Sequence, residues 1–319
     1  MSIRAVCASA LALFVAFVSA AWGQSPAVFP TRMVRIVVPF SAGSMSDVLA
    51  REIAEKLNRK WNQPVIVENR PGVAGTTAAA KAPADAYTLL LVSNGHVILN
   101  RINADLPFDA VKDFKGVSLI ATLPVLVVVP KELPVRSLTE FAALVRSRPG
   151  AMNYSSAGLG STSNIAAEFF LRTQELKMVD VPYKGALDAY TSVVRGDTQA
   201  FFAPSGVGED LIAAGEVKAL AVSGPTRLPK FRDVPTFAEA GFPDASYEAW
   251  FGLLVPAGVP GDLVDRLNRD VADVMAIPEM RRRLAEQGVT AATNSTAEFS
   301  EFLRGEAERL GRIFDPPSN

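Results

Sequence analysis

The chain has 319 residues, of which 49% are hydrophobic, and its 32 Lys and Arg residues nearly balance its 33 Asp and Glu residues. A balanced charge without a basic block excludes the usual nucleic-acid-binding surface, so we expect no nucleic-acid partner. The sequence has one cysteine, Cys7, and one histidine, His96. It therefore excludes a cysteine- or histidine-rich metal centre, and we expect no metal.

Residues 1–23 have the pattern of a cleaved signal peptide. Arg4 supplies the positive charge, residues 10–18 form an apolar core too short to span a bilayer, and Ala21 and Gly23 are small residues near the cleavage point. Cys7 lies inside this segment, so the mature chain would have no cysteine and no disulfide. We expect an exported, soluble protein whose core alone stabilises it.

Strands alternate with helices along nearly the whole chain. Apolar runs predict strands at residues 34–40, 65–68, 87–92, 123–129, 177–181, 199–202, 217–223 and 251–255. Helical spacing of apolar residues follows at 48–57, 165–171, 263–274 and 299–314. This alternation predicts an α/β fold of mixed, mostly parallel sheets with helices on both faces.

Three helix starts carry the capping-box pattern, in which a serine hydroxyl accepts from the third helical N–H group and a carboxylate reaches back. The pairs are Ser44 with Asp47, Ser137 with Glu140, and Ser295 with Glu298.

The last two helical segments need a sheet to cover, and the strand at 251–255 could return to the first sheet. We therefore expect a discontinuous first domain, residues 28–124 plus 252–319, that encloses a second domain, residues 125–251. Two chain crossings between domains form a hinge and leave a cleft, where ligands commonly bind.

Three loops rich in Gly, Ser and Thr join a strand to a helix, at residues 39–47, 71–77 and 155–164. The first N–H groups of a helix lack partners within the helix and carry partial positive charge, so such loops can hold an anion. The sequence predicts a small anionic ligand. The alternative is that these loops are tight turns and nothing more.

The motifs, taken in order, resemble the substrate-binding proteins of tripartite tricarboxylate transporters, the Bug family. The matching segments are residues 29–32 (FPTR), 38–40 (VPF), 67–72 (VENRPG), 108–114 (FDAVKDF), 153–158 (NYSSAG), 181–185 (VPYKG), 233–236 (DVPT) and 250–253 (WFGL). The resemblance implies a periplasmic protein with a two-domain Venus flytrap fold. It also implies a protein that closes over a small carboxylate, usually without a cofactor, and delivers it to permease subunits. For such an exchange with a transporter a monomer is the simpler expectation.

Site residues follow from the same resemblance and from the loops. In the first domain they are Phe40, Ser41, Ala42, Gly43, Ser44, Ser46, Gly75, Thr76 and Thr77. Ser93 and His96 follow a strand that ends at the same sheet edge, although a lone histidine is often structural. In the second domain they are Ser156, Gly158, Ser161, Thr162, Ser163, Asn164, Phe202, Ala203 and Ser205.

Ala203 departs from the pattern of the family, in which many members carry aspartate at this position. A buried ammonium group needs a partner, and alanine supplies none. We therefore expect an aromatic or aliphatic mono- or dicarboxylate rather than an amino acid, with Phe40 and Phe202 lining the apolar part of the site.

Other functions are weaker alternatives. A secreted hydrolase would need a nucleophile with a base, but the sequence has no Gly-x-Ser-x-Gly motif and a single imidazole, so we expect no enzyme. Gly72 and Gly75 do not form a dinucleotide fingerprint. A ligand-loaded sensor for a membrane receptor would use the same fold, and the sequence does not separate it from a transport protein.

Overall fold

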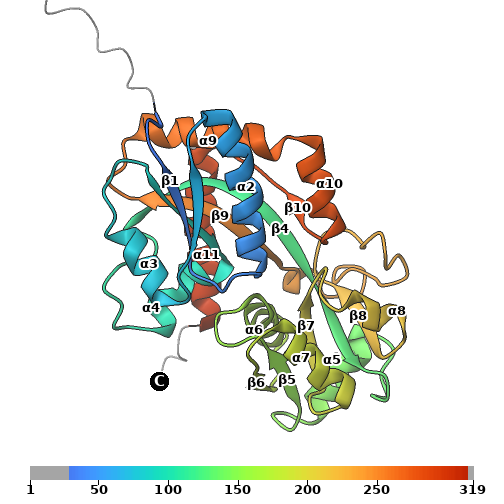
Figure 1. Ribbon diagram of the computed structural model, residues 1–319. Helices are drawn as coiled ribbons and strands as arrows, with labels where there is room; N and C mark the ends of the chain where they lie inside the picture. The colour runs from blue at the N-terminus through green and yellow to red at the C-terminus, as the bar shows by residue number, and fades with distance from the viewer. Residues whose placement is uncertain (1–28, 315–319) are drawn as a thin grey trace, which may run out of the picture.

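The computed structural model describes residues 29–314, so the predicted signal peptide and Cys7 lie outside the described residues. Within that range a 10-stranded sheet runs through two lobes (Figure 1), in the order β2-β1-β3-β9-β4-β7-β5-β6, with β8 and β10 also paired to β4. No helix between residues 29 and 314 combines the length and the apolar character that a membrane crossing requires.

The first lobe is a sheet covered on both faces. Its strands are β1 (Val34–Val38), β2 (Val65–Asn69), β3 (Thr88–Ser93), β9 (Glu248–Pro256) and β10 (Thr290–Ala291). Its helices are α2 (Met45–Trp61), α3 (Val73–Ala80), η2 (Asn94–Ile98), α4 (Leu99–Ile102), α9 (Gly261–Met275), α10 (Pro278–Glu286) and α11 (Thr296–Phe314).

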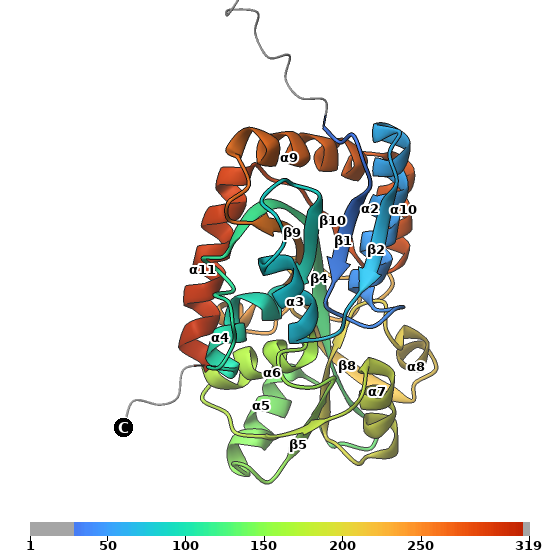
Figure 2. The same cartoon turned by 60° about the vertical axis from the view of Figure 1, so that its left-hand side comes forward.

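Alternate residues of the first-lobe strands enter two separate cores. Ile36 packs with α2, α9 and α10, whereas Val37 joins the core that includes Phe299 of α11. Figure 2 shows α11 along one side of the sheet and α2 and α10 on the other. A strand that is buried on both faces has a nearly continuous run of apolar residues in the sequence. β1 and β3 have such runs, so they could be predicted from the sequence.

The second lobe is built around the second half of β4 (Phe114–Pro130). Its other strands are β5 (Asn153–Ser156), β6 (Val179–Pro182), β7 (Ala200–Pro204) and β8 (Val217–Val222). Its helices are α5 (Leu138–Ser147), α6 (Thr162–Thr173), α7 (Ala186–Arg195), α8 (Glu209–Ala213) and η3 (Pro243–Ala245).

The strand β4 (Phe114–Pro130) belongs to both lobes. Its first part, through Pro124, pairs with β9, and its second part, from Val125, pairs with β7 and β8. This change of partners supports a hinge between Pro124 and Val125. The division into a discontinuous first domain and an inserted second domain stays a proposal on this basis.

Pairing within the sheet is mixed. β1, β2 and β3 are parallel, as are β5, β6 and β7. β4 and β9 are antiparallel to each neighbour with which they pair. The expected parallel pairing therefore holds within β1, β2 and β3 and within β5, β6 and β7, while the two central strands β4 and β9 run antiparallel to their neighbours.

The predicted helix caps form. Ser295 and Glu298 make the full reciprocal box, because the Ser295 N–H donates to the Glu298 carboxylate at 2.8 Å and the Glu298 N–H donates to Ser295 Oγ at 3.2 Å. Ser44 and Ser137 cap α2 and α5 in the same way. In these two helices the carboxylate accepts from the residue before the cap, Gly43 or Arg136, instead of from the serine.

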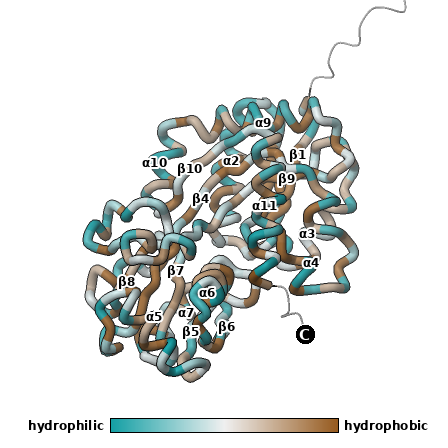
Figure 3. Tube along the Cα trace, turned by 180° about the vertical axis from the view of Figure 1, so that it is seen from behind, coloured by the Kyte–Doolittle hydropathy of each residue, from teal (hydrophilic) through white to brown (hydrophobic). Residues whose placement is uncertain are grey.

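The two lobes touch at several points. Thr162 Oγ1 on α6 donates to Asn94 Oδ1 at 3.3 Å, and Ser205 Oγ donates to the Gly288 carbonyl at 2.7 Å. Figure 3 shows both apolar and polar stretches on α6. Its buried residues include Ile165, Phe169 and Phe170, and the helix packs against η2, β9 and α11 of the first lobe. A core of buried side chains therefore continues from one lobe to the other.

Candidate functional site

A cavity of about 190 Å³ opens where loops of the two lobes meet. Three strand-to-helix connections of the first lobe, helix α4 and one loop of the second lobe form its wall. The lining residues are Pro39, Phe40, Gly72, Val73, Thr76, Val92, Ser93, Gly95, His96, Leu99, Ile102, Leu159 and Gly160. The carboxyl ends of β1, β2 and β3 thus meet at one sheet edge, as expected for parallel strands.

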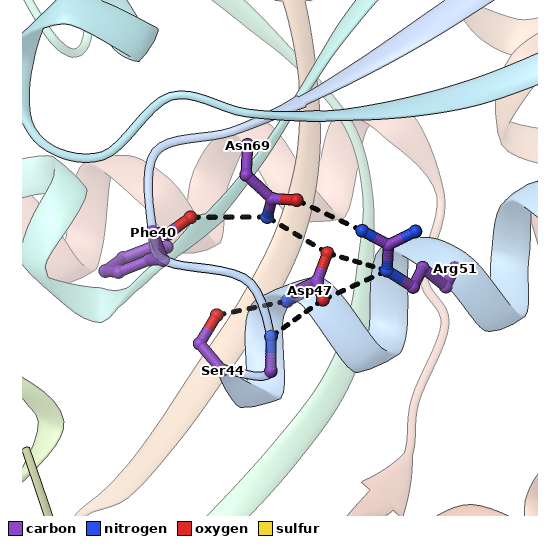
Figure 4. A network of polar contacts seen from close by, with 6 residues as sticks. Phe40, Ser44, Asp47, Arg51 and Asn69 are labelled. Atoms are coloured by element: carbon purple, nitrogen blue, oxygen red, sulfur yellow. Dashed lines mark hydrogen bonds and ion pairs between the residues drawn. The ribbon is translucent and has the colours of Figure 1, made fainter.

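The loop after β1 is held by a buried carboxylate (Figure 4). Asp47 accepts hydrogen bonds from the Gly43 N–H at 2.9 Å, from Arg51 Nε at 3.0 Å and from Asn69 Nδ2 at 2.9 Å. Asn69 Nδ2 also donates to the Phe40 carbonyl at 3.3 Å. This network joins the end of β2 to the start of α2 and positions Phe40 in the cavity wall.

Asp47 stays ionised in this network. Burial by itself would raise the pKa of Asp47, but the hydrogen bonds from Arg51, Gly43 and Asn69 outweigh it and hold the pKa below its ordinary value. Arg51 also donates to Asn69 Oδ1 at 3.1 Å, which orients the amide. The first loop is therefore held by hydrogen bonds within the protein.

The loop of the second lobe repeats this construction. Residues 43–47 read Gly-Ser-Met-Ser-Asp, and residues 160–164 read Gly-Ser-Thr-Ser-Asn. Gly43 and Gly160 both have positive φ, +80° and +75°. The Gly160 N–H donates to Asn164 Oδ1 at 3.0 Å, which matches the contact between Gly43 and Asp47. The cavity lies between two lobes that use one loop design.

Asn164 links its loop to the second-lobe core. Its Nδ2 donates to Asp180 Oδ2 at 3.0 Å and to the Tyr154 hydroxyl at 3.2 Å. Ser163 Oγ accepts from the Ala157 N–H at 3.0 Å. Burial raises the pKa of Asp180 despite hydrogen bonds from Ser156 and Asn164. The hydrogen bonds of these side chains hold the loop in place, so most of their polar atoms already have partners within the protein.

His96 lies in the cavity wall with both ring nitrogens lacking a hydrogen-bond partner among residues 29–314. His96 is 5% exposed, and its ring packs edge-on against the ring of Phe114, with 5.3 Å between the ring centroids. Burial lowers the pKa of His96 to about 4, although the Ala110 backbone opposes the shift. The imidazole is therefore neutral at physiological pH. Its two nitrogens are buried, so the ring contributes mainly its carbon atoms to the cavity wall.

Of the predicted first-domain residues, Phe40, Thr76, Ser93 and His96 line the cavity. The others support the loops without lining it: Ser41, Ala42 and Gly43 are exposed, Ser44 caps α2, and Ser46, Gly75 and Thr77 lie in the first turns of α2 and α3. A Cβ at Gly75 would lie 2.3 Å from the Arg70 carbonyl oxygen, so this glycine permits the close packing of the second loop.

The predicted second-domain residues do not line the cavity. Ser161 caps α6, and the remaining loop residues, Ser156, Gly158, Thr162, Ser163 and Asn164, surround the lining residues Leu159 and Gly160. Ser205 contacts the first lobe through Gly288.

The structure places two other predicted residues in the core. Phe202 is fully buried and packs against Phe170 at 5.6 Å between ring centroids, and Ala203 is fully buried in the core with Leu126. Both lie on β7, and neither lines the cavity, so Ala203 is not in the cavity wall.

Sequence reasoning missed the apolar lining residues Val73, Leu99, Ile102 and Leu159. Three of them lie in helical turns without any distinctive pattern. Leu159 does carry a signal, because it is a leucine between two glycines and is 66% exposed. A large apolar residue at such a loop tip is a candidate for ligand contact.

Known proteins similar to this chain share its sequence pattern and its fold. The family model described as "Tripartite tricarboxylate transporter family receptor" matches residues 49–316. A solved structure described as "R. palustris Rpa4515 with adipate" is 32% identical, with a TM-score of 0.77, and covers 89% of this chain and 97% of its own.

Two further structures agree. "MatC (Rpa3494) from Rhodopseudomonas palustris with bound malate" is 30% identical, with a TM-score of 0.77, over 90% of this chain and 100% of its own. "Structure of periplasmic binding protein BugD" is 25% identical, with a TM-score of 0.76, over 90% and 97%. The mixed α/β fold is thus that of periplasmic binding proteins, and the resemblance seen in the sequence is confirmed.

Proposed function

The chain belongs to the tripartite tricarboxylate transporter receptor family, a family of periplasmic solute-binding proteins, and from this premise we propose that it captures a small organic carboxylate between its two lobes. The filled protein then presents the acid to the permease subunits of a tripartite transporter. We propose that it acts in the periplasm as a monomer, without a cofactor and without catalysing a reaction.

The composition of the cavity wall carries this proposal. The described lining residues include no Asp, Glu, Lys or Arg, and their polar side chains are Thr76, Ser93 and the neutral His96. Hydroxyl and backbone N–H groups can donate hydrogen bonds to a carboxylate, so the site does not need a buried cation whose desolvation would be costly. An ammonium group would find no carboxylate there, which favours an acid over an amino acid.

The apolar part of the wall favours a ligand with a hydrocarbon body. Phe40, Val73, Ile102 and Leu159 contribute apolar surface on several sides of the cavity. We therefore propose an aromatic or aliphatic mono- or dicarboxylate. Two similar proteins are described with adipate and with malate, which supports the carboxylate class for this chain.

The absence of a paired base supports a binding role over a hydrolytic one. Catalysis by a serine or threonine nucleophile needs a base within hydrogen-bond reach. Within residues 29–314, neither nitrogen of His96 contacts a hydroxyl or a carboxylate. The lone imidazole in the chain therefore lacks the partners of a catalytic triad.

A thermal-shift screen of the mature protein tests the proposal. The panel contains mono-, di- and tricarboxylates, aromatic acids, amino acids, and the amide of each acid. A ligand at a hundred times its dissociation constant should add about 2.7 kcal/mol to the stability, which is a shift of a few degrees. A shift with an acid and none with its amide is the expected result. Equal shifts with the two, or a shift with amino acids alone, would refute the carboxylate assignment.

Thr76 and Thr77 offer a matched pair of variants. Thr76 lines the cavity and is 2% exposed, whereas the adjacent Thr77 does not line it. Thr76→Val removes one donor at nearly constant volume. We expect affinity for the acid to fall by about 10- to 150-fold, since a hydrogen bond to a charged group is worth about 1.5–3 kcal/mol. Thr77→Val should bind the acid as the unmodified protein does.

A further inference from the structure

The two lobes contribute different kinds of surface to the cavity between them. The hydroxyl groups of its wall belong to Thr76 on α3 and to Ser93 at the end of β3, both in the first lobe. The second lobe contributes Leu159 and Gly160, so among the described residues it adds no polar side chain to the lining. A ligand that spans the cavity therefore meets hydroxyl groups at its first-lobe end and hydrocarbon at its second-lobe end.

Leu159 is held at the tip of the second-lobe loop by the glycines on either side of it. Gly158 and Gly160 have φ angles of +101° and +75°, which residues with a side chain rarely adopt. A Cβ at Gly95 of the first lobe would lie 2.4 Å from the Gly160 carbonyl oxygen, and a Cβ at Gly160 would lie 3.3 Å from Ile102 Cδ1. The tip thus lies against η2 and α4, which places Leu159 beside the cavity.

The N–H groups on either side of Leu159 already have acceptors. The Gly158 N–H donates to Ser156 Oγ at 3.2 Å, and the Gly160 N–H donates to Asn164 Oδ1 at 3.0 Å. A second carboxylate at this end of a ligand would therefore lose water without gaining either donor. Burying a charge without a partner is costly, so the second-lobe end of the cavity disfavours an anion.

The same end of the cavity offers apolar surface that a hydrocarbon chain could cover. Leu159 is 66% exposed, so most of its side chain is in contact with water. Leu99 and Ile102, one turn apart on α4, line the same cavity. A hydrocarbon tail would remove this surface from water, which is favourable. A second carboxylate would either be desolvated against Leu159 or stay in water and leave Leu159 uncovered.

We propose that the cleft selects a monocarboxylate with a hydrocarbon tail over a dicarboxylate of the same length, and that Leu159 sets this preference. The carboxylate lies at Thr76 and Ser93, and the tail lies against Leu159 and Ile102. A cavity of about 150 Å³ accepts a benzene ring, so the cavity of about 190 Å³ has room for a six-carbon acid. This inference narrows the ligand class and rests on the carboxylate-binding function proposed above.

Hexanoate and adipate are the matched probes, because they have the same number of carbon atoms and differ by the second carboxylate. Both are titrated calorimetrically into the mature protein at pH 7, where their carboxylates are ionised. We expect hexanoate to bind at least about tenfold more tightly than adipate, since the second carboxylate finds no partner.

Three variants test the role of Leu159. Leu159→Ala should weaken the binding of hexanoate about five- to thirtyfold, because it removes the apolar surface that the tail covers. The control is Leu187→Ala, which changes a leucine of similar exposure, 69%, on α7 outside the cavity, and it should leave the affinity unchanged. Leu159→Arg places a cation at the tip and should make adipate bind at least as tightly as hexanoate.

Each contrary result has a distinct meaning. Adipate that binds the unmodified protein as tightly as hexanoate would overturn this inference and leave the carboxylate-binding function standing. Hexanoate that fails to bind at about 10 mM would also overturn it. Equal effects of Leu159→Ala and Leu187→Ala, or an unchanged preference in Leu159→Arg, would show that Leu159 does not set the preference. If no acid of the thermal-shift panel binds, the proposed function fails together with this inference.

Discussion

Replacing Asp47 by alanine removes the carboxylate on which the first loop converges. Three donors lose their acceptor: the Gly43 N–H, Arg51 Nε and Asn69 Nδ2. The side chain of Asp47 is 4% exposed, whereas that of Arg51 is 56% exposed. Water can therefore solvate the freed guanidinium, but it reaches the Asn69 amide less easily.

The magnitude follows from that difference in exposure. Breaking a fully buried ion pair costs about 3–5 kcal/mol, and an exposed pair contributes about 0–1 kcal/mol. With one buried and one exposed partner, we expect Asp47→Ala to lower the free energy of unfolding by about 2–3 kcal/mol. For a chain of this size the corresponding change in Tm is about 3–5 °C.

Urea unfolding followed by circular dichroism measures this loss. The control is Asp273→Ala, which removes an ion pair with Lys60 at the other end of α2. Lys60 and Asp273 are 34% and 67% exposed, so the control should lose less than about 0.5 kcal/mol. If Asp47→Ala and Asp273→Ala unfold at the same urea concentration, the Asp47 network does not fix the loop as argued.

Three further predictions concern pH, lobe contact and core packing. Because folding lowers the pKa of Asp47, the stability that its carboxylate contributes is fully present above the ordinary pKa and is lost as the pH falls through the pKa of the folded protein. In urea unfolding, the difference in stability between the unmodified protein and Asp47→Ala should therefore shrink below about pH 4. A difference that stays constant with pH would contradict this. Gly95→Ala puts a Cβ 2.4 Å from the Gly160 carbonyl oxygen, so the lobes must separate. Small-angle X-ray scattering should show a larger radius of gyration, and calorimetry should show weaker binding of the acid. An unchanged radius of gyration together with an unchanged affinity would disprove the contact. Gly252→Ala puts a Cβ 2.2 Å from Phe299 Cζ and should cost about 1–3 kcal/mol in urea unfolding; an unaffected midpoint would mean that this core can shift.

Strands buried on both faces and helices with capping serines were predictable, because those patterns depend on neighbours along the chain. The first half of β4 was not predicted. Gly116 and Ser118 interrupt its apolar pattern, and the register with β9 shifts between Gly116 and Ser118. Both residues are buried, since Gly116 faces Phe299 and Ser118 Oγ bonds to the Leu119 carbonyl. Small residues that fit a tertiary contact carry no strand signal of their own.

The candidate site was predictable at the level of loops but not of individual side chains. The Gly-Ser-rich segments do surround the cavity, yet most of their hydroxyls bond to their own loops, as Ser44 and Ser161 do. Capping and ligand binding require the same residue types, so composition cannot separate the two roles. The apolar lining from Ile102 and Leu159 depends on how the lobes meet, which no local pattern records.

A crystal structure of the mature protein with the acid that gives the largest thermal shift would show where the ligand binds. We expect the acid in the cavity between the lobes, with a carboxylate oxygen within about 3 Å of Thr76 Oγ1 or Ser93 Oγ. An acid bound outside this cavity, or one whose carboxylate points away from both hydroxyls, would contradict it.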